Sequence, residues 1–292
     1  LLPFLYMIDD VTKWNDINEL RKSNPNLGVS VKVNFLLDEI ATAEQSLSKR
    51  AEFLTKYCNI KQKSSQAWLN AVDIEKAFGE PLDLNDFREC YCVGGIDLSM
   101  TTDLTASGIV IEKNGEFYVF MQFYLPSEKV EAATERDGIP YSQFIQRGLL
   151  VESGENAIDY QDCENWFKHL VEEYEIYPLQ TGYDRYMAQY LVQNMKMYGF
   201  HMDDVYQGEN LTPVINEVEG LFKDGKIHCG DNDLLKIHLL SSAMKKNAIT
   251  GRQRLVKISQ EDHIDGCAAL LDAFCVHQKW YETLGSQLKN GD

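Results

Sequence analysis

The hydrophobic pattern between residues 90 and 125 predicts three consecutive strands. This region contains three apolar runs of strand length, which polar residues separate. They are YCVGGIDL (91–98), TASGIVIE (105–112) and EFYVFMQFYL (116–125). Short apolar runs bounded by turn signals are typical of buried strands. Asn114-Gly115, between the second and third runs, is a strong signal for a tight hairpin turn. We therefore expect an antiparallel meander of three strands.

Beyond residue 158, helical spacing alternates with short strand-like runs. Helices are expected at 159–176, 186–198, 210–223, 231–247 and 263–282. Between them lie the strand-like runs LQTGYD (179–184), DVYQ (204–207), GKIHC (225–229) and RLVKIS (254–259). A meander followed by alternating helices and strands is typical of a mixed sheet with helices on its faces. The expected fold class is α/β, with antiparallel and parallel strands in one sheet.

Residues 1–84 have a different pattern and are expected to form a separate part of the chain. Residues 1–10 are interpreted as a buried strand, and helical spacing follows at 35–57 and 64–78. Pro81 marks a boundary, because the residue before a proline is disfavoured in a helix. The expected domains are therefore 1–84 and 85–292. Since the chain lacks an initiator methionine, we expect it to be a fragment of a longer protein.

Charge is distributed unevenly along the chain, although the net value is −17. This acidity argues against a basic coat for nucleic acid over the whole surface. Residues 91–240 carry 10 basic and 25 acidic side chains, whereas 241–260 carry five basic ones and no acid. That stretch is either an anion-binding patch or a solvated hairpin, and charge alone does not decide between them. Its basic residues are Lys245, Lys246, Arg252, Arg254 and Lys257.

Two features of composition exclude other classes of protein. No apolar run approaches the ~20 residues that a membrane-spanning helix needs, so no membrane association is expected. The seven cysteines are odd in number and include no C-x-x-C pair, which favours reduced thiols over a disulfide framework or a zinc ribbon.

Three acids stand at the polar ends of apolar elements and are the candidates for chemistry. Asp97 ends the first strand, Asp184 ends LQTGYD, and Asp265 opens the last helix. Strand ends and helix starts of such a sheet meet at one edge, where ligands bind. Carboxylates suit Mg²⁺, and a cluster of them can hold two ions about 4 Å apart. Taken singly, each acid is also explained as a cap of a turn or helix.

The neighbouring polar residues are assigned by their distance from this edge. Asp103 reaches the same edge if the turn after Asp97 folds back. Asp272 is expected to lie outside the site, because it is seven residues after Asp265 on one helix, or about 10 Å further along. Lys257 ends a strand close to Asp265 and is expected either near the metal site or as an exposed lysine. No ATP site is expected, because GLFKDGKI (220–227) lacks the Ser or Thr of a P-loop.

The motifs GGIDLSMTTDLTA (94–106), TGYDRYMAQYL (181–191) and HIDGCAALLDAF (263–274), in that order, resemble the large terminase subunit of tailed bacteriophages. The resemblance implies a nuclease domain with a ribonuclease H-like fold at 85–292. It implies that Asp97, Asp184 and Asp265 bind two Mg²⁺ or Mn²⁺ ions, with Asp103 as a fourth ligand. Residues 1–84 would be the end of an ATPase domain and a helical linker, without the ATPase motifs.

This resemblance implies an endonuclease that cleaves double-stranded viral DNA during genome packaging, in the cytoplasm of the infected bacterial cell. Its partners would be the portal protein, the small terminase subunit and the missing ATPase domain, and residues 245–257 would contact the DNA backbone. Two alternatives remain open. One is a non-catalytic docking module for the portal or the small subunit. The other is an actin-like phosphotransferase, because GIDLSMTTDLT also resembles the first phosphate loop of that family.

Overall fold

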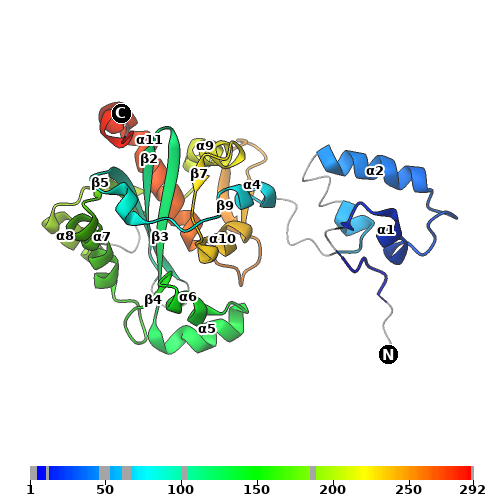
Figure 1. Ribbon diagram of the computed structural model, residues 1–292, viewed down its shortest axis with the longest axis horizontal. Coiled ribbons are helices and arrows are strands. Elements are labelled where there is room, and N and C mark those ends of the chain that lie inside the picture. The colour runs from blue at the N-terminus through cyan, green and yellow to red at the C-terminus, as the bar shows by residue number, and fades with distance from the viewer. Residues whose placement is uncertain are drawn as a thin grey trace. The chain divides into compact units, whose positions relative to one another are not determined.

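The computed structural model describes residues 5–10, 13–45, 53–60, 67–99, 104–184 and 189–290. It consists of two compact units, Leu1–Ala67 and Trp68–Asp292 (Figure 1). The smaller unit contains helices α1 (Ile17–Ser23) and α2 (Val33–Gln45). Its core is formed by buried side chains that include Leu20, Leu36 and Phe53.

The strand expected at residues 1–10 is wrong for the part that the structure describes. Residues 5–10 form no strand. Leu5 is 82% exposed, and Ile8 is the apolar side chain of this segment that enters the core of the smaller unit. An apolar run becomes a strand when another strand pairs with it. The backbone contact here is one hydrogen bond, from Ile8 N–H to the Cys58 carbonyl at 3.3 Å.

Residues 68–84 pack on the larger unit. Cys229 N–H donates to the Ala77 carbonyl at 2.7 Å, and Gly79 N–H donates to the Gly230 carbonyl at 2.9 Å. This segment contains α4 (Ala71–Lys76). The compact unit therefore begins before the boundary expected at residue 84. The assignment of residues 1–84 to an ATPase domain end and linker is a separate question and stays a prediction.

The larger unit is built on a seven-stranded mixed sheet in the order β4-β3-β2-β1-β5-β6, with β7 also paired to β3. β1, β2 and β3 form the expected antiparallel meander, and β5 and β6 run parallel to β1. Asn114 and Gly115 both have positive φ, at 56° and 77°, as the hairpin turn requires. The strands are β1 (Tyr91–Asp97), β2 (Thr105–Lys113), β3 (Glu116–Leu125), β4 (Leu150–Glu152), β5 (Tyr177–Asp184), β6 (Met202–Val205) and β7 (Ile227–His228).

Helices cover both faces of the sheet (Figure 1). α7 and α8 lie on one face, and α9, α10 and α11 lie on the other. Side chains of β3 alternate between the two cores, so Val119 and Met121 enter one and Tyr118 and Phe120 the other. The helices are α5 (Val130–Asp137), α6 (Tyr141–Gln146), α7 (Tyr160–Tyr174), α8 (Gln189–Tyr198), α9 (Thr212–Lys223), α10 (Asp233–Leu240) and α11 (Asp265–Leu288), with short 3₁₀ turns η2 (Leu84–Phe87), η3 (Ser127–Lys129) and η4 (Glu209–Leu211).

The helix expected at 231–247 is wrong beyond residue 240. α10 ends at Leu240, and the chain then forms an antiparallel hairpin of β8 (Ser242–Lys246) and β9 (Gln253–Lys257). Ala243 and Met244 are buried in this hairpin, while Leu240 is 45% exposed. Pairing with β9 has overridden the helical propensity of the AMKK stretch, because tertiary context decides such short segments.

None of the helices in the described part of the chain has the length and apolar character that crossing a bilayer requires.

Candidate metal centre

Asp97 and Asp184 lie at the same edge of the sheet. They end β1 and β5, which are parallel neighbours. Ile96 of β1 is in register with Tyr183 of β5, so the next residue of each strand is one of the two aspartates. Both carboxylates therefore stand at the carboxyl end of the sheet, where open α/β sheets bind ligands.

Two glycines allow α11 to approach this edge closely. A Cβ atom on Gly95 would lie 1.9 Å from the Ala269 carbonyl oxygen, and one on Gly182 would lie 2.4 Å from the Asp272 carbonyl oxygen. No side chain fits at either position, so the helix backbone rests directly on β1 and β5. This contact brings Asp272, from the middle of α11, to the strands that carry Asp97 and Asp184.

Asp272 is fully buried, and its Oδ1 atom has no hydrogen-bond partner among the residues that the structure describes. Burial and the negative charges of Asp97 and Asp184 raise the pKa of the Asp272 carboxyl well above 3.8, although a hydrogen bond from Gln207 opposes this. A buried carboxylate that lacks a partner is costly. A cation at this position would compensate the charge.

Gln207 connects two of these acids. Its Nε2 atom lies 3.2 Å from Asp97 Oδ1 and 2.9 Å from Asp272 Oδ2, so the amide group donates to both carboxylates. Gln207 follows β6, whose last residue, Val205, is in register with Asp184. Four neighbouring elements, β1, β5, α11 and the segment after β6, thus meet at one place.

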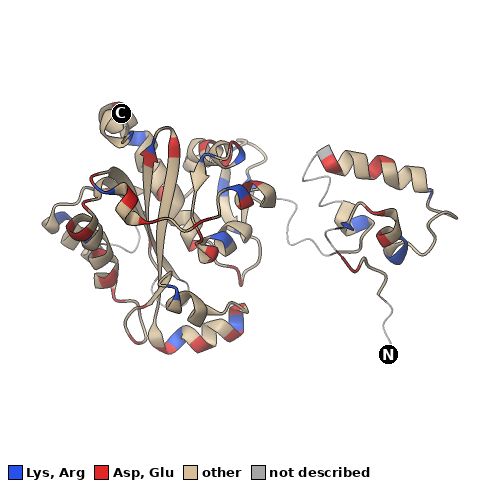
Figure 2. Ribbon diagram, viewed as in Figure 1, with Lys and Arg blue, Asp and Glu red and all other residues tan. Residues whose placement is uncertain are grey.

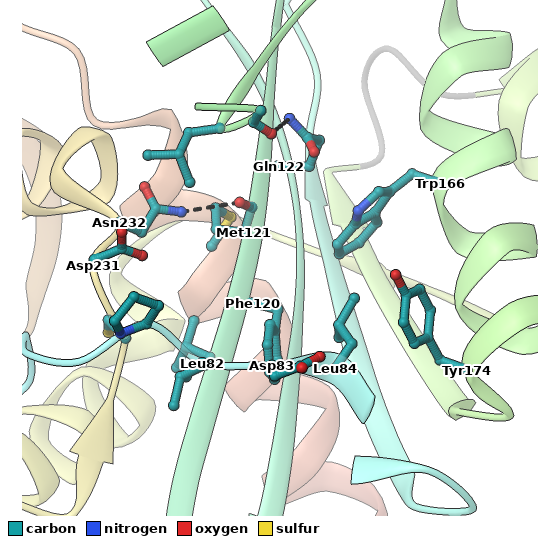
Figure 3. Close-up of a pocket in the computed structure, with 16 residues that line it drawn as sticks. Leu82, Asp83, Leu84, Phe120, Met121, Gln122, Trp166, Tyr174, Asp231 and Asn232 are labelled. Atoms are coloured by element: carbon teal, nitrogen blue, oxygen red, sulfur yellow. Dashed lines mark hydrogen bonds between the residues drawn. The ribbon is translucent and has the colours of Figure 1, made fainter. Parts of the chain in front are cut away.

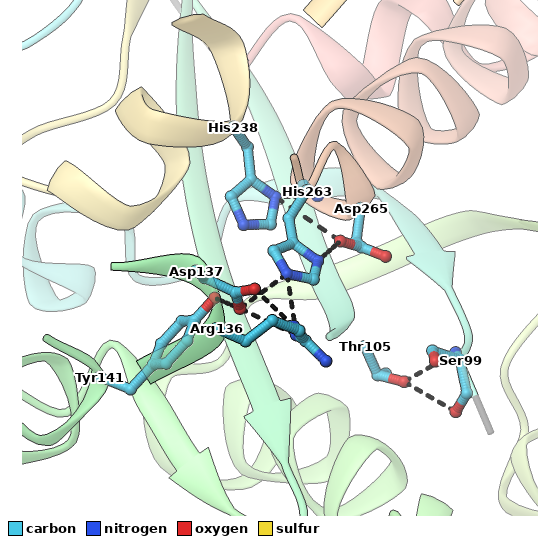
Figure 4. Close-up of polar contacts among 9 residues, drawn as sticks. Ser99, Thr105, Arg136, Asp137, Tyr141, His238, His263 and Asp265 are labelled. Atoms are coloured by element: carbon cyan, nitrogen blue, oxygen red, sulfur yellow. Dashed lines mark hydrogen bonds and ion pairs between the residues drawn. The ribbon is translucent and has the colours of Figure 1, made fainter. Parts of the chain in front are cut away.

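Asp265 lies in a second polar cluster at the start of α11 (Figure 4). Its Oδ2 atom is 3.6 Å from His263 Nδ1 and 3.9 Å from His238 Nδ1. The sequence placed Asp265 in the site and Asp272 outside it. In the structure, Gln207 connects Asp272 with Asp97, whereas the carboxylate of Asp265 faces the two histidines. Both Asp265 and Asp97 act electrostatically on Cys267, in the first turn of α11.

The second cluster holds a buried ion pair. His263 Nε2 is 2.9 Å from Asp137 Oδ2, and both side chains are almost fully buried. Burial alone would lower the pKa of His263, but the carboxylates of Asp265 and Asp137 outweigh it and raise the pKa. Asp137 also accepts from Tyr141 at 2.9 Å and from Arg136 at 2.8 Å. His263 therefore joins α5 to the start of α11.

His238 is fully buried, and burial lowers its pKa to about 4, so it is neutral near pH 7. Its Nδ1 atom accepts from Gly266 N–H at 3.0 Å, which leaves the ring proton on Nε2. His238 thus fixes the first turn of α11 from the side of α10. Lys257 contributes to the lowered pKa of His238, so its charge acts in this cluster.

The loop after Asp97 is closed by a polar clamp. Ser99 N–H donates to Thr105 Oγ1 at 2.9 Å (Figure 4), and Tyr160 Oη donates to the Ser99 carbonyl at 3.1 Å. The clamp draws the start and end of the loop together. Asp103, expected as a fourth ligand, lies outside the described residues.

The basic stretch of the sequence forms the β8–β9 hairpin. Lys245 is directly opposite Arg254, and both are exposed. Two like charges on opposite strands repel each other, and an anion between them relieves that repulsion. Acidic side chains are spread over the rest of the larger unit (Figure 2). The residues Lys245, Lys246, Arg252 and Arg254 form no ion pair with the part of the chain that the structure describes.

A groove of about 520 Å³ lies on the side of β3 that faces away from β2 (Figure 3). β4 pairs with 123–125 and β7 with 117–118, so no described strand covers 119–122 on that side. Its apolar walls include Leu82, Trp166 and Tyr174. Its carboxylates have structural partners, since Asp83 caps η2 and Asp231 pairs with Arg147. The groove therefore offers apolar contact and no catalytic group.

Comparisons with known proteins agree with this architecture. Residues 2–279 match the family model of the terminase large subunit, endonuclease domain. The chain is 24% identical over 291 residues to protein YmfN of Escherichia coli (strain K12), covering 94% of this chain and 62% of YmfN. It is 25% identical over 193 residues to the terminase large subunit of Enterobacteria phage HK97, covering 65% of this chain and 37% of that protein.

The crystal structure of the HK97 bacteriophage large terminase is similar at a TM-score of 0.63 and 21% identity, over 93% of this chain and 56% of that one. This likeness confirms the ribonuclease H-like fold expected from the sequence. The chain spans less than two thirds of the length of each of these relatives. Because the family model covers nearly all of its residues, the chain belongs to the family of terminase large subunit endonuclease domains.

Proposed function

We propose that this chain is a divalent-metal-dependent endonuclease that cleaves double-stranded viral DNA during genome packaging. The observation that carries the proposal is the meeting of Asp97, Asp184 and the buried Asp272 at one sheet edge, with an oxygen of Asp272 left without a hydrogen bond. A nuclease of this family would act in the cytoplasm of the infected host. The portal, the small subunit and an ATPase domain would be its partners.

The donor set suits Mg²⁺ or Mn²⁺, which prefer carboxylate oxygen. Among the described residues, no three His, Cys, Asp or Glu side chains are already arranged around one point for a metal. Movement of the Asp184 side chain would therefore accompany metal binding, because Gln207 already holds Asp97 and Asp272. Asp97, Asp184 and Asp272 would hold one ion. Asp265, with Asp97 and Asp103, would hold the second, as the resemblance to the terminase family implies.

The side chains have separate roles in the reaction. Two divalent ions, when bound, supply an activated water and stabilise the leaving oxygen of the phosphodiester. Asp97, at the centre of the edge, would help to hold both ions. Asp184 and Asp272 would hold one of them, and Asp272 is fully buried at that place. Lys257, whose charge acts at His238 beside Asp265, would contact the scissile phosphate.

Supercoiled plasmid DNA tests the proposal directly. We expect the purified chain to convert it to nicked and linear forms with Mn²⁺ or Mg²⁺, and we expect excess chelator to stop the reaction. Two plasmids of unrelated sequence should be cut at similar rates, because the carboxylates of the centre would act through metal ions on the phosphodiester and not on the bases. Cleavage that persists in chelator would contradict the metal mechanism.

The β8–β9 hairpin would position DNA by its phosphates. Neutralising Lys245 and Arg254 together, each to Gln, should weaken DNA binding equally for unrelated sequences. The slope of log affinity against log salt should fall by about one unit for each phosphate that the hairpin no longer binds. Fluorescence anisotropy over a range of salt concentrations measures this slope.

The matched control is the double variant Lys223→Gln and Lys226→Gln, at two exposed lysines near the end of α9. It changes the net charge by the same amount at another place. If both double variants change the slope equally, then only total charge matters and the hairpin is simply a solvated element.

A second candidate function is docking without catalysis, and the groove at the β3 edge is the observation that favours it. A portal or small-subunit segment could occupy the apolar walls and pair with the part of 119–122 that no described strand covers, next to the Met121 carbonyl that accepts from Asn232 at 3.0 Å. The plasmid assay separates the two, because a docking module would not cut DNA at any metal concentration.

A further inference from the structure

We propose that Gln207 is a positioning residue of the metal centre, which holds the carboxylates of Asp97 and Asp272 in the orientation that binds the cation. The inference rests on the proposed function, because it concerns the same ion. It adds a residue that no sequence motif marked.

The geometry at the amide is specific. A primary amide nitrogen carries two hydrogens, and two acceptors lie within reach, at 3.2 Å and 2.9 Å. The amide takes Oδ2 of Asp272 and leaves Oδ1, which is buried and has no hydrogen-bond partner among the described residues. One side chain thus fixes the rotation of two carboxylates. Outer hydrogen bonds of this kind orient metal ligands in proteins.

The backbone on either side keeps Gln207 in place. Val205, two residues before it, is 3% exposed, and Leu211, four residues after it, is 5% exposed, so buried side chains anchor the segment at both ends. Between them, Gly208 N–H donates to the Tyr206 carbonyl at 2.9 Å. A Cβ atom on Gly208 would lie 2.6 Å from Cε1 of the exposed Tyr206 ring, so a larger residue there would displace that ring. The Gln207 side chain therefore projects from a short turn whose backbone is anchored on both sides.

The exposure of Gln207 distinguishes positioning from packing. The residue is exposed, yet its amide reaches a fully buried carboxyl group. A long side chain loses rotamer freedom when it is held in this way. Two hydrogen bonds to carboxylates offset this loss of side-chain entropy, because hydrogen bonds to charged groups are stronger than hydrogen bonds between neutral groups. Little apolar packing depends on this side chain, so its replacement should leave the fold intact.

The test is Mn²⁺ binding by titration calorimetry, with Gln207→Met as the variant. Methionine has a similar length and donates no hydrogen bond. We expect Mn²⁺ affinity to fall by about 10- to 100-fold, the usual effect of removing an outer hydrogen bond to a metal ligand. The Mn²⁺ concentration that gives half-maximal plasmid cleavage should rise by the same factor. The rate at saturating Mn²⁺ should change little, because Gln207 does not touch the reacting atoms.

Gln122→Met is the matched control, since that amide donates to a backbone carbonyl, Gly148 O, at 3.1 Å beside the groove at β3 and to no carboxylate of the metal centre. It should bind Mn²⁺ as the wild type does. Unchanged or tighter Mn²⁺ binding by Gln207→Met would overturn the inference, the latter because the amide would then compete with the ion. If Asp97→Asn binds Mn²⁺ as well as the wild type does, the metal centre itself is wrong. That result is distinct from a failure at Gln207 alone.

Discussion

Replacing Asp97 with asparagine should reduce metal-dependent plasmid cleavage by about 100- to 1000-fold. The change removes the central negative charge of the sheet edge, and metal ions supply several kcal/mol of transition-state stabilisation. Each 1.36 kcal/mol corresponds to a factor of about ten in rate. Asparagine has the same shape, and its oxygen can still accept the hydrogen bond from Gln207. The fold should therefore survive, as measured by circular dichroism and thermal melting.

Asp86→Asn is the matched control, because Asp86 is exposed in η2, before the opposite end of β1. It should cleave at the wild-type rate. The same assay ranks the other acids, and we expect Asp272→Asn to lose at least as much activity as Asp265→Asn. Wild-type cleavage by Asp97→Asn would remove the sheet edge from the mechanism.

The sequence predicted the strands of the meander closely because their pattern is strong. The limits of β3, Glu116–Leu125, are those expected, and β1 and β2 differ from expectation by one residue at an end. Each strand is a continuous apolar run buried between two layers of helices. The Asn114-Gly115 turn supplied the register. Local information was therefore sufficient for this part of the fold.

Asp272, the third acid of the site, could be identified only by knowing how α11 crosses the sheet. The spacing along one helix placed Asp272 about 10 Å from Asp265 and therefore outside the site. That argument assumed that the helix leads away from the edge. In the structure, α11 lies across β1 and β5, so Asp272 contacts the strand that ends in Asp184. The available signal was a lone carboxylate within the otherwise apolar run AALLDAF, which a buried helix tolerates only with compensation.

Contacts between segments far apart in the chain could also not be predicted from the sequence. The segment 126–158, without a clear period, contains α5, α6 and β4. Asp137 at the end of α5 pairs with His263, 126 residues later. Nothing local at either residue indicates that partner. The β8 strand likewise depends on β9, and its own residues favour a helix.

Replacing Gly95 with alanine should lower the stability of the larger unit by about 3 kcal/mol, at the upper end of the usual cost of overpacking. The new Cβ atom would lie 1.9 Å from the Ala269 carbonyl oxygen and 2.7 Å from the Ala273 nitrogen. Both are backbone atoms of α11, so no side chain can rotate away. The helix must move outward, and a close-packed interior resists such a shift. Thermal melting should show a fall of about 6–12 °C, at 2–4 °C per kcal/mol for a domain of this size.

Gly220→Ala is the matched control for this change. Gly220 lies within α9, and a Cβ there would meet nothing within 4 Å. The same added methyl group should raise stability by up to about 1 kcal/mol, because alanine favours a helix more than glycine does. The two variants should thus shift the melting temperature in opposite directions. In Gly95→Ala, Asp272 would also move with α11, so Mn²⁺ affinity should fall below that of the wild type even at temperatures where the protein remains folded. If Gly95→Ala melts like the wild type, then α11 does not rest on β1 as closely as the metal centre requires.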